Sequence, residues 1–173
     1  MISTSSYKNW KSDKYRVVSI SGDRGMGANY KGNCYPKLAP KLGFWRIWHD
    51  NIGKIPEKEN NLYYIEEYYK QVLSRLDPEE IFRELGEVTL LCYEEPDEFC
   101  HRHIVAAWFE LFLDVKIKEV GSAEECYKEL VQAAYNATPA CTTDNSADDA
   151  TDDNISDLAK TLDAIENAYD SEA

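Results

Sequence analysis

Long apolar runs, basic segments and regularly spaced cysteines are all scarce in this 173-residue chain. No stretch is long and apolar enough to cross a bilayer, and residues 1–6 contain neither the basic part nor the apolar part of an export signal. We therefore expect a cytoplasmic protein without a membrane partner. The five cysteines are an odd number without the close spacing of a disulfide framework, which is typical of reduced thiols.

Positive charge is also scarce, with 19 Lys and Arg against 32 Asp and Glu and a net charge of −13. Residues 137–173 contribute −9 of this charge, which leaves −4 for residues 1–136. A basic surface that would bind a nucleic acid backbone is therefore absent as a global property.

The first half of the chain contains recognisable strand and helix signals. Residues 15–21 are rich in strand-forming residues and run into a glycine-rich loop over 22–27. Residues 36–50 carry two prolines and are expected to be a broken helix or irregular. Helical spacing of apolar residues predicts a helix over 61–76. Asp77, Pro78 and an acid at the third helical position then predict a new helix that ends at Gly86.

The second half continues the alternation. The apolar run 88–92 predicts a strand covered on both faces, and 93–99 is a polar, acidic loop. A helix is expected over 100–113, a third strand over 115–120, and a last core helix from the capping residues at 121–125 to about residue 135.

This order of elements predicts an α/β fold, with a mainly parallel sheet of three to five strands flanked by helices. We assign residues 1–136 to this domain. Residues 137–153 are acidic and poor in large apolar side chains, so we expect a flexible linker. Residues 154–170 repeat apolar side chains at helical spacing and predict one amphipathic helix at the end of an acidic tail.

The candidate site follows from where parallel strands end, because ligands in open parallel sheets bind beyond the carboxyl ends of the strands. Two loops leave such ends, over 22–32 and over 93–99. The second loop leads to Cys100-His101-Arg102 at a predicted helix N-terminus, where unpaired N–H groups and the helix dipole favour an anion. We expect the two loops to approach each other, with Arg24, Tyr30 and Lys31 on the first and Glu94 on the second.

Two interpretations of the triplet 100–102 stay open. In the functional one, Arg102 binds the anion, His101 exchanges protons, Glu94 is a base or a ligand of a hydroxyl group, and Cys100 is a nucleophile with a lowered pKa. In the structural one, Cys100 is packed at a helix start, His101 is a capped surface imidazole, and Arg102 neutralises the acids of the preceding loop.

Other motifs are weaker. The loop 22–27 lacks the lysine and hydroxyl of a P-loop and the spacing of a dinucleotide fingerprint, so a tight turn is expected. Cys92 is most simply a core residue. Several Cys and His residues could surround zinc, but their spacing matches no common structural site. We therefore predict no metal site and assign no cofactor. The residues considered for zinc are Cys34, Cys92, Cys100, His101 and His103.

The run 90–94, followed by 99–102 and then by 104–108, resembles the Domain of Unknown Function 488 family. Residues 18–21 leading to 35–40, and Tyr64 with Tyr68 before Val72, are similar to the phage and bacterial branch of that family. The resemblance covers roughly residues 6–120. It implies a Rossmann-like α/β domain and no established reaction. The residues that it carries over are Cys92, Glu94, Cys100, His101 and Arg102.

Two functions from different classes follow. The first is an enzyme-like domain that binds a small phosphorylated or nucleotide-type ligand at the Cys-His-Arg site, with Arg24, Tyr30, Lys31 and Cys92 beside it. The second is an acidic interaction protein, such as a phage-type inhibitor of a host factor that mimics nucleic acid. It would act through its surface or tail, and residues 154–170 would bind a protein partner or a second copy of the chain.

Overall fold

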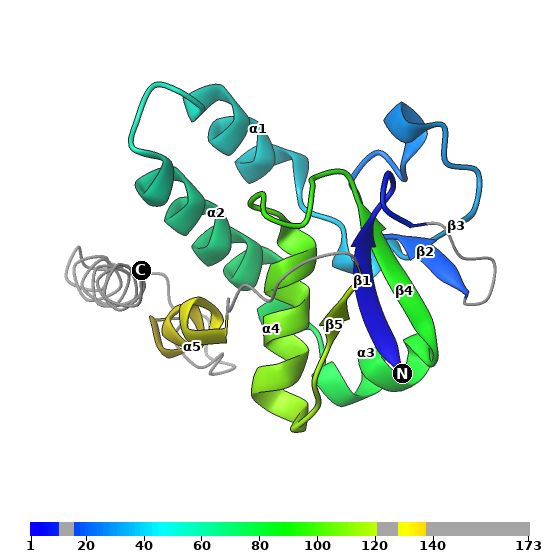
Figure 1. The fold of residues 1–173 in the computed structure, drawn as a ribbon. Coiled ribbons are helices and arrows are strands. Elements are labelled where there is room, and N and C mark those ends of the chain that lie inside the picture. Colours follow the sequence, from blue (N-terminus) through cyan, green and yellow to red (C-terminus); the bar gives the residue numbers. More distant parts are fainter. Residues whose placement is uncertain (11–15, 121–127, 138–173) are drawn as a thin grey trace, which may run out of the picture.

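The computed structural model describes residues 1–10, 16–120 and 128–137, and for residues 128–130 it describes the backbone alone. Five strands form one parallel sheet in the order β3-β2-β4-β1-β5 (Figure 1). This confirms the predicted α/β fold. The strands are β1 (Ile2–Ser6), β2 (Val17–Ser19), β3 (Asn33–Cys34), β4 (Val88–Cys92) and β5 (Lys118–Glu119).

Strand β1 is the main correction to the predicted order, which began with a strand at 15–21. It lies inside the sheet, between β4 and β5. Its sequence is almost entirely hydroxylic, and the hydroxyls find partners: Ser3 Oγ lies 2.9 Å from Thr89 Oγ1, and Ser5 Oγ donates to the Val120 carbonyl oxygen at 3.2 Å. A strand without apolar alternation gives no signal along the chain, because its burial depends on neighbours that come later.

The helices follow the predicted alternation with shifted ends. The segment 36–50 is a broken helix, the first of its two expected forms, because a 3-10 helix over 36–38 is separated by residues 39–41 from a regular α-helix that begins at residue 42. The helix expected at 61–76 begins at residue 57 and ends at residue 71, and a 3-10 helix follows it over 73–75. The α-helices are α1 (Leu42–Asn51), α2 (Glu57–Gln71), α3 (Pro78–Leu85), α4 (His101–Leu113) and α5 (Lys128–Ala137), and the 3-10 helices are η1 (Met26–Ala28), η2 (Pro36–Leu38) and η3 (Leu73–Arg75).

The two ends of α3 confirm the predicted signals. The Asp77 side chain accepts a hydrogen bond from the Glu80 backbone N–H at 2.9 Å, and Gly86 ends the helix with a φ of 64°. The third strand is only the two residues of β5, shorter than the predicted 115–120. The predicted start of the last helix at 121–122, the linker and the tail helix lie outside the described residues.

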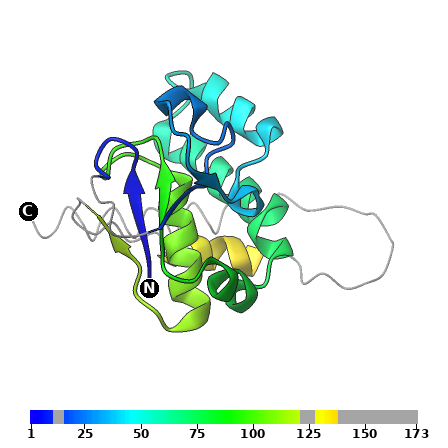
Figure 2. The ribbon, with the colours of Figure 1, turned by 90° about the vertical axis from the view of Figure 1, so that its right-hand side faces the viewer.

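Strand β4 is the centre of the core. All five of its residues are buried, as the apolar run predicted, and it pairs with both β1 and β2. Helix α4 packs against β1 and β4, and α2 and α5 pack against α4 (Figures 1 and 2). No helix among the described residues is both long and apolar enough to span a membrane.

Candidate functional site

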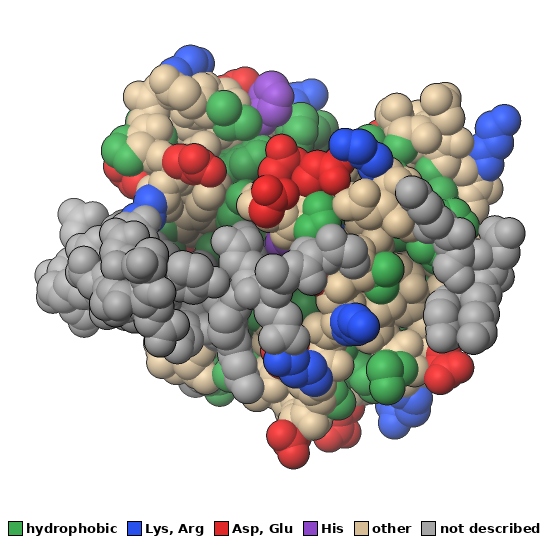
Figure 3. All heavy atoms as spheres, in the orientation of Figure 1, with side chains coloured by type: hydrophobic (Ala, Val, Ile, Leu, Met, Phe, Trp, Pro, Cys, Tyr) green, Lys and Arg blue, Asp and Glu red, His purple; other side chains and the backbone are tan. Residues whose placement is uncertain are grey.

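A cavity of about 530 Å³ opens where β2 and β4 end. The two strands are parallel neighbours, so their carboxyl ends meet at one edge of the sheet. Helices α1 and α2 contribute the opposite wall. In Figure 3 a hollow lies between the part of the molecule with α1 and the strand ends, with hydrophobic side chains in it and acidic ones beside it. The described lining is Ser21, Gly22, Asp23, Gly27, Pro40, Leu42, Trp45, Trp48, Tyr64, Cys92, Tyr93, Glu94, Phe99, Cys100 and His101.

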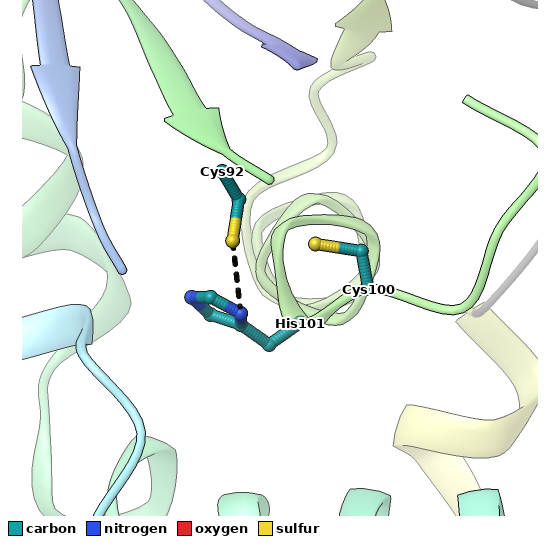
Figure 4. Close-up of side chains that lie close together, drawn as sticks. All are labelled: Cys92, Cys100 and His101. Atoms are coloured by element: carbon teal, nitrogen blue, oxygen red, sulfur yellow. Dashed lines mark hydrogen bonds between the residues drawn. The ribbon is translucent and has the colours of Figure 1, made fainter. Parts of the chain in front are cut away.

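Three side chains from two elements meet in the lining of this cavity. Cys92 is the last residue of β4, Cys100 is the N-cap of α4, and His101 is the first helical residue. Figure 4 shows the three side chains pointing toward one another. The Cys92 sulfur lies 3.5 Å from His101 Nδ1, and one ligand atom of each residue lies within 4.8 Å of the others. Cys92, Cys100 and His101 therefore form one cluster.

The orientation of His101 is set by the backbone of Ile20, the residue that follows β2. Its Nε2 lies 3.0 Å from the carbonyl oxygen of Ile20. Because a carbonyl oxygen only accepts, Nε2 carries the hydrogen and donates it, which leaves Nδ1 facing the sulfurs. Ile20 is itself held by its N–H, which donates to the Leu91 carbonyl oxygen at 3.1 Å. His101 is buried, so the expectation of a surface imidazole was wrong.

The pKa values of the two thiols are shifted in opposite directions. Burial raises the pKa of the Cys92 thiol well above its usual value, and the neighbouring Cys100 sulfur adds to this. Burial also opposes ionisation of Cys100, but hydrogen bonds from Cys92 and His101 and the charges of His101 and Arg102 outweigh it, so its pKa lies well below the usual value. Of the two thiols, Cys100 is therefore the more acidic.

Glu94 is the carboxylate of the cluster. Burial raises its pKa to about 7, with further increases from the charge and hydrogen bond of Cys100. Its Oε2 is buried and has no hydrogen-bond partner in the described part of the chain. A carboxyl group that titrates near neutral pH can both accept and donate a proton.

Aromatic side chains form the wall opposite the cluster. Tyr64 is the centre of this wall, with its ring centroid 5.4 Å from those of both Trp48 and Phe99 and 5.1 Å from that of Phe44. Trp48 is fixed by its indole N–H, which donates to Asn61 Oδ1 at 3.0 Å. Such a wall offers flat, weakly polar surface to a ring-shaped ligand.

The loop after β2 forms the rim of the cavity and is organised by Asp23. The Asp23 carboxylate accepts hydrogen bonds from the N–H groups of Gly25 and Gly27, at 2.9 and 3.0 Å, and from the Tyr93 hydroxyl. Gly25 has a φ of +80°, and a side chain there would collide with the ring of Tyr7. These contacts join the two predicted loops, as expected from the parallel strands.

Arg102 is fully buried beneath the cluster. Its Nη1 and Nη2 donate to the backbone carbonyl oxygens of Glu94 and Glu95, at 2.8 and 3.0 Å. Its Nε lies 3.2 Å from the carboxylate of Glu119 on β5. The guanidinium therefore shapes the loop that carries Glu94, and it is absent from the described cavity lining. Its predicted contact with an anion stays a prediction.

Three further predicted ligand residues lie away from the described lining. Arg24 and Lys31 are exposed. The Tyr30 hydroxyl donates to the backbone carbonyl oxygens of Val17 and Asn33, at 3.2 and 3.1 Å. The structure brings other residues of the same loop, Ser21 and Asp23, to the cavity instead. A ligand role for the three residues stays a prediction.

Sequence reasoning missed the part that Trp48 and Phe99 play in the aromatic wall, and the part that Asp23 plays at the rim. Trp48 and Phe99 lie 51 positions apart and meet only after α1 folds over the strand ends, with ring centroids 5.7 Å apart. The available signal was the density of large aromatics in 44–48, on a segment that was expected to be a broken helix or irregular. Asp23 offered a second signal, since an acid inside a glycine-rich turn commonly binds backbone N–H groups.

The architecture and the site define a Rossmann-like α/β domain with a thiol, imidazole and carboxyl cluster at the carboxyl edge of its sheet. The family model of the active DUF488-N3 subclade (DUF488-N3a) matches residues 6–112, more than half of the chain. The chain therefore belongs to the Domain of Unknown Function 488 family. No curated protein and no solved structure matches it at a significant level. The assignment to a phage and bacterial branch stays a prediction.

Proposed function

We propose that this protein is an enzyme that binds the flat ring of a nucleotide-type ligand in the cavity. The side chains of Cys100, His101 and Glu94 would then carry out the reaction. One observation carries the proposal: the reactive cluster and the aromatic wall line the same cavity. The family model that matches the chain is described as an active subclade, which agrees with a reaction rather than a purely structural role.

The charge of the cavity favours the base of such a ligand over its phosphate. Two of the described lining residues are acids, Asp23 and Glu94, and none is Lys or Arg. A phosphate placed beside these carboxylates would be repelled, whereas a heteroaromatic ring can stack on Trp48 or Tyr64. Asp23 and Glu94 can also accept hydrogen bonds from ring N–H or amino groups. We therefore expect the ring to enter first and any phosphate to remain outside.

Glu94 is the acid–base group in this proposal. Its buried Oε2 has no hydrogen-bond partner in the described part of the chain, so a ligand that reached it would supply the missing hydrogen bond. Arg102 is a positioning residue, because it binds the backbone of Glu94 rather than lining the cavity.

The test has a binding part and a turnover part. Nucleobases, nucleosides, nucleotides and matched sugar phosphates are titrated into the full chain by calorimetry, and the same mixtures are analysed by mass spectrometry after incubation. We expect binding of the ring-containing compounds only, and conversion of at least one of them. Trp48→Ala should weaken binding about tenfold or more, the usual effect of losing a stacking side chain. Glu94→Gln keeps one acceptor oxygen, so it should weaken binding only slightly while it abolishes conversion.

The matched control is Tyr135→Ala, which removes an exposed aromatic residue of α5 that is absent from the described lining. It should leave both readouts unchanged. Equal binding by wild type and Trp48→Ala, or conversion that survives Glu94→Gln, would overturn the proposal.

A further inference from the structure

The cluster of Cys92, Cys100 and His101 has the spacing of a zinc site. The Cys92 sulfur and His101 Nδ1 are 3.5 Å apart, and the ligand atoms of all three residues lie within 4.8 Å of one another (Figure 4). In a tetrahedral site with Zn–S near 2.3 Å and Zn–N near 2.1 Å, neighbouring ligand atoms are about 3.6 Å apart. Small side-chain movements would therefore bring the three atoms around one ion.

The orientation of His101 is the second argument. Metal-binding imidazoles usually donate their other N–H to a carbonyl or carboxylate, which fixes the ring and leaves one lone pair for the metal. His101 has this arrangement, because Nε2 donates to the Ile20 carbonyl oxygen at 3.0 Å and Nδ1 faces the sulfurs.

Glu94 provides the third argument. It lines the same cavity as the three possible ligands, and its buried Oε2 lacks a hydrogen-bond partner within the described structure. A buried carboxylate oxygen without a partner is costly, and a metal-bound water would supply the missing hydrogen bond. Since three protein ligands leave one tetrahedral position open, such a water has a place beside the cavity.

The ligand types select the metal. Thiolates and imidazole are preferred by zinc, whereas Mg²⁺ and Ca²⁺ require sets of oxygen ligands. We propose that Cys92, Cys100 and His101 bind a zinc ion whose fourth position faces the aromatic cavity and holds a water, with Glu94 as the acceptor of a proton from that water. The spacing of these residues along the chain gives no such signal, because β4 and α4 bring them together only in the folded protein.

This inference deepens the proposed function and rests on it for the role of the water, although the binding of the ion stands on the cluster alone. The zinc ion would be held by both thiolates and the neutral imidazole, so its uptake releases protons. Cys100 would then act as a ligand of the metal rather than as a nucleophile that attacks the ring.

The experiment uses the metal alone as the probe. The full chain is stripped with a chelator and titrated with Co²⁺, and the sulfur-to-cobalt charge-transfer absorption is recorded, followed by displacement with Zn²⁺. We expect one ion per chain, thiolate absorption, and complete displacement by Zn²⁺. Because this measurement uses the wild-type protein, it does not depend on whether any variant folds.

Variants then assign the ligands. Cys92→Ser, Cys100→Ser and His101→Gln should each lower the affinity for the metal ion by more than about tenfold. Changes in residues that only orient a metal ligand already cause losses of about this size, and loss of a ligand itself should cost at least as much. Cys34→Ser is the matched control, since Cys34 is a half-buried thiol outside the cluster and should leave the titration unchanged. Absence of thiolate absorption in the wild type, or its loss in Cys34→Ser alone, would overturn the inference.

The two proposals fail in different ways. If the chain binds and converts a nucleotide-type ligand with no metal bound, the zinc site is wrong and the proposed function stands. If the chain binds Zn²⁺ through the three residues but no ring-containing compound, the metal site stands and the proposed function is wrong.

Discussion

Arg102 holds the backbone of Glu94 from beneath: its Nη1 donates to the Glu94 carbonyl oxygen at 2.8 Å. The adjacent Nη2 binds the next carbonyl oxygen, of Glu95, at 3.0 Å, and the Glu119 carboxylate lies beside Nε. One planar guanidinium thus joins the loop after β4 to strand β5. Lysine cannot reproduce this fork of donors.

Arg102→Lys is therefore expected to lower the free energy of unfolding by about 2 kcal/mol, the usual worth of hydrogen bonds to a charged group. It should also reduce conversion of a bound ligand more than its binding, because Glu94 loses its support. Urea unfolding and the turnover assay check the two effects. Arg83→Lys, an exposed exchange on α3, is the control, and an equal loss in both variants would contradict the role assigned to Arg102.

Glu119 links stability to pH. Burial would raise its pKa, but a hydrogen bond from His103, the charge of Arg102 and a hydrogen bond from Thr4 outweigh it, so the pKa lies below its usual value near 4.5. The carboxylate therefore stabilises the fold above about pH 4.5, and this contribution is lost as the pH falls below that value.

At pH 7, Glu119→Gln should cost about 3 kcal/mol, because it leaves the buried Arg102 without its counter-charge. The gap between wild type and variant should narrow when urea unfolding is repeated below pH 4. A gap of the same size at both pH values would show that the charge of Glu119 contributes nothing.

Asp23 controls the rim of the cavity. Burial opposes its ionisation, but the hydrogen bonds from Tyr93, Gly27, Gly25 and Ser21 lower its pKa to about 2. The loop should therefore stay organised at neutral pH and loosen on acidification from about pH 4 toward about pH 2. Asp23→Asn should speed hydrogen exchange of the Gly25 and Gly27 amides at pH 7. Asp97→Asn, an exposed change in the neighbouring loop, should not.

Tyr68 connects the helices to the segment before α1. Its buried hydroxyl donates to the Leu38 carbonyl oxygen at 2.6 Å, and its ring packs edge-on against His101 with centroids 5.5 Å apart. Tyr68→Phe should cost about 1–3 kcal/mol because the carbonyl oxygen loses its partner inside the core. Thermal unfolding checks this. Tyr63→Phe, at a half-buried position of the same helix, is expected to have a smaller effect.

Removal of residues 138–173 tests the hypothesis that the protein acts by binding a protein partner. The family model ends at residue 112, and the described helix α5 ends at residue 137. If the cavity is the functional part, a chain that ends at residue 137 should keep its ligand binding and its Co²⁺ spectrum. Loss of cellular activity with both retained would favour a tail that binds a protein partner, and the mass in solution with and without residues 154–173 would show whether that partner is a second copy.

The sequence determined the α/β class, strand β4, the capped start of α3 and the junction that carries the triplet 100–102. These signals are local: an Asp-Pro start, an apolar run and the polar loop that follows this run each act within a few residues. The family could likewise be inferred from the residues around Cys92 and Cys100, which stand close together in the chain.

Only the tertiary structure decided what those residues do together. Strand β1 is polar and is buried because its hydroxyls meet partners from β4 and β5. Arg102 lies under the loop because Glu119, 17 positions later, lies beside it. The aromatic wall exists because α1 and α2 fold over the strand ends. Each of these depends on contacts between residues far apart in the chain, and local patterns hold no information about which distant partners will meet.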